Sequence, residues 1–246
     1  MTLHLAAFGA GVLAGFLNVM AGGGSLITLP ILLFLGFPAA LANGTNRVAI
    51  LVQNVAAVTS FRQQGLSDVR TGLRLAAVTL PGAVVGAFIS LRVSDATFRV
   101  ILAAVLIVAV AGLLRPPGRT ADYAGPGTPG VATYLALVGV GLYGGFLQAG
   151  VGFLFMVVLH RMLRLDLVRT NMYKVFIVLV YTIPTLTVFV WSGNVRWLTG
   201  LVLAAGSAAG AVIATRVSVR GGERYIRPVV AVALVLMAAR LVVQSR

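Results

Sequence analysis

Long uncharged stretches dominate the pattern of hydrophobic and polar positions along this chain. No side chain that is charged at neutral pH occurs within residues 5–46, 123–160 or 175–195. Each stretch is at least as long as the ~20 apolar residues that cross a bilayer as a helix. The pattern therefore predicts an all-α polytopic membrane protein.

Breaks rich in charge, Pro and Gly divide the chain into ten apolar segments. The run RPPGRTADYAGPGTPG at 115–130 breaks any helix and marks a linker. We therefore expect an N-terminal transmembrane repeat at 1–114 and a C-terminal one at 131–246. The start has no basic leader or cleavage site, so the first segment is expected to be retained. The segments are 5–20, 25–37, 39–61, 73–91, 97–114, 131–149, 153–163, 167–191, 197–215 and 226–243.

The two halves resemble one another in sequence. GFLN at 15–18 corresponds to GFLQ at 145–148, and in one register further along Asn43 corresponds to Asn171 and Arg99 to Arg227. Matches of the rarer Asn and Arg residues indicate duplication better than shared glycines do. Two repeats, with a substrate site where their broken helices meet near the midplane, are typical of secondary transporters.

The second segment of each half is short and follows a glycine-rich turn. At about 1.5 Å per residue, neither 25–37 nor 153–163 spans a core of about 30 Å, so both are expected to be broken or re-entrant. About 8–10 transmembrane helices result. If every segment crosses once, the repeats are inverted, and most loop arginines, such as Arg62 and Arg220, lie on one side. That side should be cytoplasmic and both termini external; if the short segments are re-entrant, the arginines divide almost evenly.

Composition supports a membrane protein. Hydrophobic residues make up 59% of the chain and charged residues 10%, with a mean hydropathy of +1.02, whereas about a quarter of a globular domain is charged. The net charge of +14 comes from arginines that stand singly in short loops, which fits membrane orientation and not nucleic-acid binding. Cysteine is absent, and His4 and His160 are not spaced as metal ligands, so we expect no thiol chemistry, metal, cofactor or enzymatic activity.

All the acidic residues fall in predicted loops. A cation transporter or proton pump usually needs a buried carboxylate, so this class of function loses weight. If protons drive transport, we expect coupling to depend on the protonation of the substrate more than on a buried carboxylate. The acidic residues are Asp68, Asp95, Asp122, Asp166 and Glu223.

Two cations, in contrast, fall inside apolar segments. Arg47 and Lys174 each lie roughly 12 Å from the start of a segment. A central Arg or Lys costs about 2.5–3.5 kcal/mol to insert, and no carboxylate within the segments is available to neutralise it. A bound anion would supply the partner, so removing either charge should weaken anion binding and leave folding intact or improved. The alternative is that both side chains snorkel to the nearer interface.

Polar and glycine residues near these cations complete the candidate substrate site. Side chains beside them can donate hydrogen bonds to oxyanions, or instead hold helices together. The turns before the short segments offer backbone N–H groups and the positive end of a helix dipole. Glycines at GxxxG spacing elsewhere, such as Gly11 and Gly15 or Gly141 and Gly145, predict close helix packing. The candidates are Asn18, Gly22, Gly23, Gly24, Ser25, Asn43, Thr45, Asn46, Arg47, Gln53, Gln148, Gly150, Gly152, Asn171 and Lys174.

These residues resemble a known family. GFLNVMAGGGSLITLPILLFLGFPAALANGTNRVAILVQN and its weaker echo GFLQAGVGFLFMVVLHRMLRLDLVRTNMYK are similar to the sulfite exporter TauE/SafE proteins. The second glycine turn departs from the first, with Val151 in its middle. The resemblance implies a bacterial inner-membrane secondary transporter that exports small sulfur-containing anions, such as sulfite or organosulfonates, driven by an ion gradient.

Other functions stay open at this stage. Sulfite rests on the resemblance alone, because the residues themselves indicate only a carrier of small anions. A permease for a different organic anion, such as sulfoacetate, is the nearest alternative, and a membrane scaffold or biogenesis factor is the next. The expected partners are a small anion and the lipid bilayer, and assembly into a homo-oligomer is compatible with the sequence.

Overall fold

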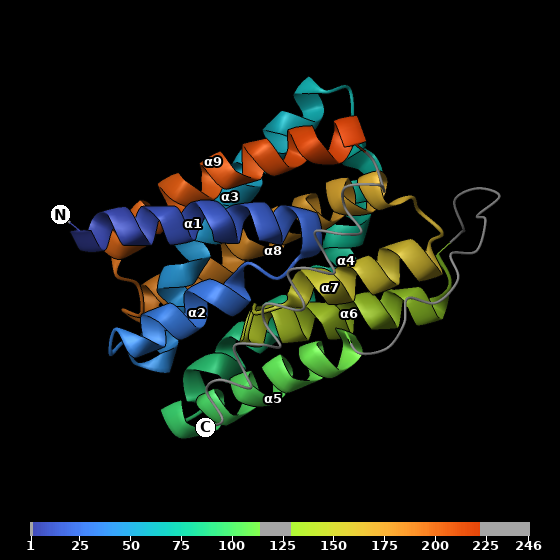
Figure 1. Cartoon of the computed structure of the whole chain (residues 1–246). Coiled ribbons are helices and arrows are strands. Elements are labelled where there is room, and N and C mark those ends of the chain that lie inside the picture. Colours follow the sequence, from blue (N-terminus) through green and yellow to red (C-terminus); the bar gives the residue numbers. More distant parts are fainter. Residues whose placement is uncertain (1, 114–128, 222–246) are drawn as a thin grey trace.

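The computed structural model describes residues 2–113 and 129–221, and over these ranges every regular element is a helix (Figure 1). The predicted all-helical class is confirmed. The predicted segment 226–243 and residues 115–128 of the linker lie outside the described residues. The elements are α1 (Thr2–Ala21), α2 (Ser25–Phe34), α3 (Ala39–Gln63), α4 (Val69–Arg92), α5 (Asp95–Leu113), α6 (Val131–Phe146), α7 (Val151–Met156), the π-helix η1 (Val157–Met162), α8 (Leu167–Trp191) and α9 (Trp197–Gly221).

Local capping chemistry sets several helix starts. Asp68 accepts a hydrogen bond from the Thr71 backbone N–H at 3.1 Å and begins α4. Asp166 accepts from the Arg169 backbone N–H at 2.8 Å and begins α8. Such side-chain caps satisfy backbone donors that have no partner within the helix. Asp68 and Asp166 therefore lie in loops, as the sequence predicts, whereas Asp95 is the first residue of α5, and Asp122 and Glu223 lie outside the described residues.

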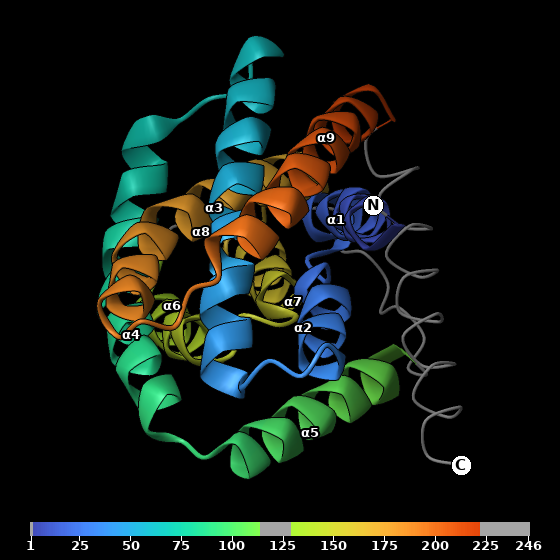
Figure 2. The same ribbon diagram turned by 90° about the vertical axis from the view of Figure 1, so that its left-hand side faces the viewer.

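Glycines let helices of the two halves approach to backbone contact. In α1, a Cβ built on Gly15 would lie 2.1 Å from the Ser207 carbonyl oxygen of α9. In α6, a Cβ on Gly145 would lie 1.8 Å from the Ala83 carbonyl oxygen of α4. The predicted GxxxG packing is confirmed. The first helix of each half thus packs on the fourth helix of the other, and Figure 2 shows α1 from its end beside α9.

The two long helices α3 and α8 pack against one another in the interior. α3 also packs on α9, and α8 on α4. In Figure 2, α3 runs through the middle of the molecule and α5 lies along one edge. The interior of α3 is unusually polar, because Asn43, Asn46, Arg47, Gln53 and Asn54 are all buried.

Several helices suit a bilayer. Within the described residues, α4, α8 and α9 are long and apolar enough to cross a membrane. α2, α6 and the α7–η1 segment are apolar but shorter, as the sequence predicts for the second segment of each half. α3 has 25 residues, but its buried polar side chains lower its hydropathy. A long helix whose polar and charged side chains are buried within the protein is typical of a substrate site in a membrane protein.

Candidate functional site

The two glycine-rich turns touch each other. Short turns at residues 22–24 and 147–150 separate α1 from α2 and α6 from α7. Gly22 and Gly150 have φ values of +80° and +71°, the left-handed region in which a side chain is strained. A Cβ on Gly22 would lie 2.3 Å from the carbonyl carbon of Gly152. The structure therefore brings together the turns that the sequence singles out in each half.

The second turn begins earlier than the sequence predicts. α6 ends at Phe146 and not near Ala149, because the chain unwinds at Gln148, whose φ is +65°. The Gln148 side chain is buried and accepts hydrogen bonds from Arg47 Nη1 at 3.3 Å and from the Tyr181 hydroxyl at 3.2 Å. A strained, non-glycine backbone of this kind is characteristic of functional sites.

Arg47 is completely buried and reaches from α3 to the end of α6. Its Nη2 donates to the carbonyl oxygens of Gly144, at 3.2 Å, and Gly145. Its Nη1 donates to the Thr185 hydroxyl at 2.9 Å. The guanidinium also lies over the Phe189 ring, 4.8 Å from the ring centroid. Both fork nitrogens are therefore satisfied by protein groups, with a cation–π contact besides.

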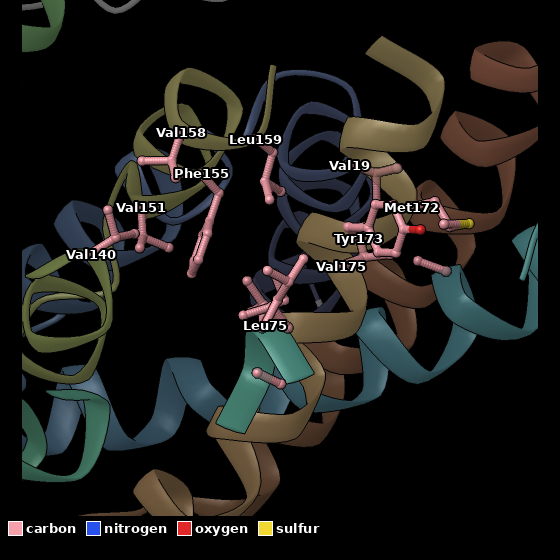
Figure 3. Packing of buried hydrophobic residues seen from close by; sticks show 14 of the residues in the cluster. Val19, Leu75, Val140, Val151, Phe155, Val158, Leu159, Met172, Tyr173 and Val175 are labelled. Carbon is pink, nitrogen blue, oxygen red and sulfur yellow. The ribbon is translucent and has the colours of Figure 1, made fainter. Parts of the chain in front are cut away.

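Lys174 is also buried and reaches from α8 to the end of α1. Its Nζ donates to the Val19 carbonyl oxygen at 2.7 Å and to Asn171 Oδ1 at 2.7 Å. Figure 3 shows Val19 next to Tyr173 and Val175, the residues on either side of Lys174 in the chain. Neither cation therefore snorkels to an interface.

The two cations occupy reciprocal positions. Each contacts the last-turn carbonyl groups of the first helix of the opposite half, Arg47 on α6 and Lys174 on α1. The negative end of a helix dipole stabilises a cation at such a position. Both helix ends lead directly into the glycine turns that touch. A cavity common to both cations stays a prediction, because their contacts lie at different helix ends.

The polar neighbours of Arg47 on α3 have separate roles. Asn43 Nδ2 donates to Ser90 Oγ at 3.0 Å and to the Phe146 carbonyl oxygen at 2.7 Å. Asn46 Oδ1 accepts from the Thr28 hydroxyl at 2.6 Å, which joins α3 to α2. The Thr45 hydroxyl accepts from the Arg196 backbone N–H at 2.9 Å, before the start of α9. Thr45 thus holds a loop in place, whereas Asn43 connects α3 to α4 and to the end of α6, and Asn46 connects α3 to α2.

Most of the buried polar atoms without a protein partner in the described residues lie on α3 and α8; Asn43 Oδ1 on α3 is an acceptor, and Ser218 Oγ lies on α9. Four are nitrogen donors on α3 and α8, and the Thr182 hydroxyl on α8 is a fifth potential donor. A buried donor without an acceptor costs about 1–3 kcal/mol, so such groups need explanation. An anion would accept from them. The nitrogen atoms are Asn46 Nδ2, Arg47 Nε, Gln53 Nε2 and Asn171 Nδ2.

The remaining predicted residues line the first turn. Ser25 is buried at the start of α2, and no side chain caps this helix at Gly24. Asn18 is half-buried, and a Cβ on Gly24 would lie 2.6 Å from its Cβ. Gly23 lies between Gly22 and Gly24 in the turn and is buried. The free N-terminus of α2 therefore faces a crowded junction of polar groups and glycines.

Sequence reasoning missed the contribution of the second half of α8. Tyr181, Thr182 and Thr185 are buried there, around Pro184 in the helix interior. Tyr181 and Thr185 contact Gln148 and Arg47, respectively. A signal existed, since these are the polar positions of an otherwise apolar stretch.

Acidic side chains stay away from both cations. Within 2–113 and 129–221, the one ion pair joins Arg169 to Asp166 at 3.5 Å, at the exposed start of α8. Asp68 accepts a hydrogen bond from the Tyr173 hydroxyl at 2.7 Å. The hydrogen bonds from Thr71, with that from Tyr173, hold the pKa of Asp68 below its usual value. This contact is thus present at neutral pH and is lost as the pH falls through that lowered pKa.

A pocket of about 170 Å³ opens beside this Asp68–Tyr173 contact. It lies between the end of α3, the following loop and the start of α8. Arg62 and Ser67 also line it, together with apolar residues. The pocket therefore borders Tyr173, the residue that precedes Lys174.

Comparison with known proteins decides the family. The model of the family described as sulfite exporter TauE/SafE matches residues 7–241. The chain belongs to this family. Proteins similar to it include probable membrane transporter protein ORF9 of Sinorhizobium sp., 29% identical over 98% of this chain and 94% of the relative. Probable membrane transporter protein YfcA of Escherichia coli K12 is 27% identical over 97% of this chain and 89% of the relative.

A third similar protein is also named a probable membrane transporter. A probable membrane transporter protein of Haemophilus influenzae is 25% identical over 96% of this chain and 92% of its own length. No solved structure matches the chain. The protein is therefore a membrane transporter of the TauE/SafE family, which implies a small substrate and a lipid bilayer as its surroundings.

Proposed function

We propose that this TauE/SafE protein is a secondary transporter that exports small sulfur-containing anions, such as sulfite or organosulfonates, across the bacterial inner membrane. One observation carries the proposal. Arg47 and Lys174 are buried, no carboxylate of residues 2–113 or 129–221 pairs with either of them, and unpartnered donors lie on the same helices, α3 and α8. A site with excess positive charge and excess donors favours a small oxyanion.

The electrostatics of the helix ends sharpen this selectivity. The last-turn carbonyls of α1 and α6 are occupied by the two cations, so the negative helix ends are covered. The start of α2 has no side-chain cap and leaves a positive helix end free at the same junction. A cation would therefore meet repulsion at this junction, whereas an anion would meet donors.

We further propose that the protein consists of two inverted repeats, 1–114 and 131–246, that cross the membrane several times and move relative to one another. The reciprocal packing of α1 on α9 and of α4 on α6 supports this, and so does the reciprocal placement of the two cations. Transporters with such repeats expose a site alternately to each side. The contact of Gly22 with Gly152 would then lie at the junction of the two halves.

Single cysteines test the topology in a chain that has none. Ser67 lies in the exposed loop between α3 and α4, and Ser94 in the exposed loop between α4 and α5. Because α4 separates them, Ser67→Cys should be protected from an impermeant thiol reagent in intact cells, and Ser94→Cys should react. Lysis should make Ser67→Cys reactive. Labelling of Ser67→Cys in intact cells would refute the inverted topology.

Flux measurements test the transport proposal itself. Purified protein in liposomes should move sulfite down its gradient, and sulfoacetate should compete with it. If the liposomes take up another organic anion and no sulfite, the proposed substrate class is wrong and that anion takes its place. A reconstituted, folded protein that carries none of these anions and shows no anion-induced rise in its unfolding temperature would favour a membrane scaffold.

A further inference from the structure

Lys174 is the only lysine in the chain, whereas the other 18 of the 19 basic residues are arginines. An arginine stays protonated under all ordinary conditions, but a lysine can lose its proton when it is buried. The one lysine of the chain therefore lies at a buried position beside the junction of the glycine turns. This choice is informative, because arginine supplies the positive charge everywhere else.

The hydrogen bonds of Lys174 match a neutral amine. A protonated ammonium has three N–H donors, whereas a neutral amine has two. Nζ has two acceptors, Val19 O and Asn171 Oδ1, both at 2.7 Å and both uncharged. The two acceptors thus satisfy both N–H donors of the neutral amine and leave one donor of the charged form without a partner. The adjacent Asn171 Nδ2 is also buried without a partner.

Resting on the anion transport proposed above, we propose that Lys174 is neutral when the site is empty and takes up one proton from water when an anion binds. The third N–H of the ammonium and Asn171 Nδ2 then donate to the anion. The neutral amine and the free anion thereby become an ammonium–anion pair with one added proton. When the anion leaves, the proton returns to water on that side, so anion and proton cross the membrane together, and export then requires an outward anion gradient that exceeds any inward proton gradient.

Within the part of the chain that the structure describes, the hydrogen bonds of the amine go to uncharged acceptors. Besides Asn171, Val19 of α1 contacts Nζ. Helix α1 carries no titratable side chain after His4. The Tyr173 hydroxyl is engaged with Asp68 and the Tyr181 hydroxyl with Gln148. On α8 and the helices that pack against it, the remaining charged or titratable side chains are Arg47, Arg62, Arg70, Arg74, Arg92, Tyr134, Tyr143, His160, Arg161 and Arg169.

Arg47 has a different role in this scheme. Its fork is bound to four oxygen atoms of the protein and it stacks on Phe189. It keeps its charge, and it pins α3 to α6. In this scheme the fixed cation at the end of α6 attracts the anion in every state and leaves the change of charge to Lys174.

The single lysine makes its protonation directly measurable. With isotope-labelled lysine, the full-length protein gives one side-chain signal, whose chemical shift distinguishes amine from ammonium. Near neutral pH we expect the neutral form without ligand and the ammonium after saturation with sulfoacetate. Sulfoacetate is the probe of choice because its acidic groups stay ionised in this range, whereas sulfite can take up a proton itself. An ammonium signal in the ligand-free protein would overturn the proposal.

The charge-fixed variant Lys174→Arg provides the second readout. Above the pH at which the ligand-free amine becomes neutral, the affinity of the wild type for sulfoacetate should fall about tenfold with each further pH unit. The reason is that one proton binds with the anion. Lys174→Arg should bind sulfoacetate with little dependence on pH and show reduced flux without proton movement. Proton-coupled flux in this variant would contradict the role of Lys174. Wild-type flux without proton movement would sink this inference alone, whereas absence of any anion flux would sink the proposed function.

Discussion

Replacing Gly22 by alanine should destabilise the protein far more than the same replacement at Gly36. Both glycines have nearly the same backbone conformation, with φ values of +80° and +82°. Alanine in this region costs roughly 1–2 kcal/mol at either position. At Gly22 the new Cβ would also lie 2.3 Å from the Gly152 carbonyl carbon, whereas at Gly36 it would meet nothing within 4 Å. Overpacking adds about 1–3 kcal/mol at Gly22 alone.

Thermal unfolding of the detergent-purified variants measures this difference. Gly36→Ala serves as the matched control for backbone strain, so the difference between the two unfolding temperatures reports the contact between the turns. Gly22→Ala should also lower anion flux, because the contact lies at the junction of the broken helices. Equal unfolding temperatures for the two variants would show that the turns do not touch in the membrane.

The sequence was a good guide to the helices because uncharged stretches and capping residues are local signals. α3, α4 and α8 begin or end within a few residues of the predicted bounds. The end of α6 was missed, because Gln148 adopts a left-handed backbone that no local preference favours. The π-helix η1 also could not be predicted, since widening of a helical turn depends on its tertiary packing.

The sequence singled out the two buried cations, but it could not predict their contacts. Charge in an apolar stretch is rare enough to single out Arg47 and Lys174 from the sequence. That each contacts the helix end of the opposite half depends on packing between segments far apart in the chain. The same reason explains Thr45, whose hydroxyl is used by the Arg196 backbone N–H and is not free for a ligand. Inversion of the repeats and membership of the substrate site stay predictions.

The contacts of Arg47 also change what its removal should do. The charge alone suggests that Arg47→Gln would leave folding intact or improved, since insertion of a central arginine costs about 2.5–3.5 kcal/mol. Hydrogen bonds to a charged group, however, contribute about 1.5–3 kcal/mol each. Arg47 makes four of them and covers the Phe189 ring. The lost contacts therefore outweigh the saving.

Arg47→Gln should thus lower the free energy of unfolding by about 3 kcal/mol or more and also abolish anion binding, because the carbonyl oxygens at the end of α6 lose their donors. Arg47→Lys, which keeps the charge but not the planar fork, should fall between this variant and the wild type. Arg62→Gln removes an exposed arginine from the last turn of the same helix and should change stability by less than about 0.5 kcal/mol. Thermal unfolding with and without sulfite measures both effects. If Arg47→Gln unfolds and binds like the wild type, the cation is dispensable, and the anion must bind at Asn18, Gln53 and Gln148 instead.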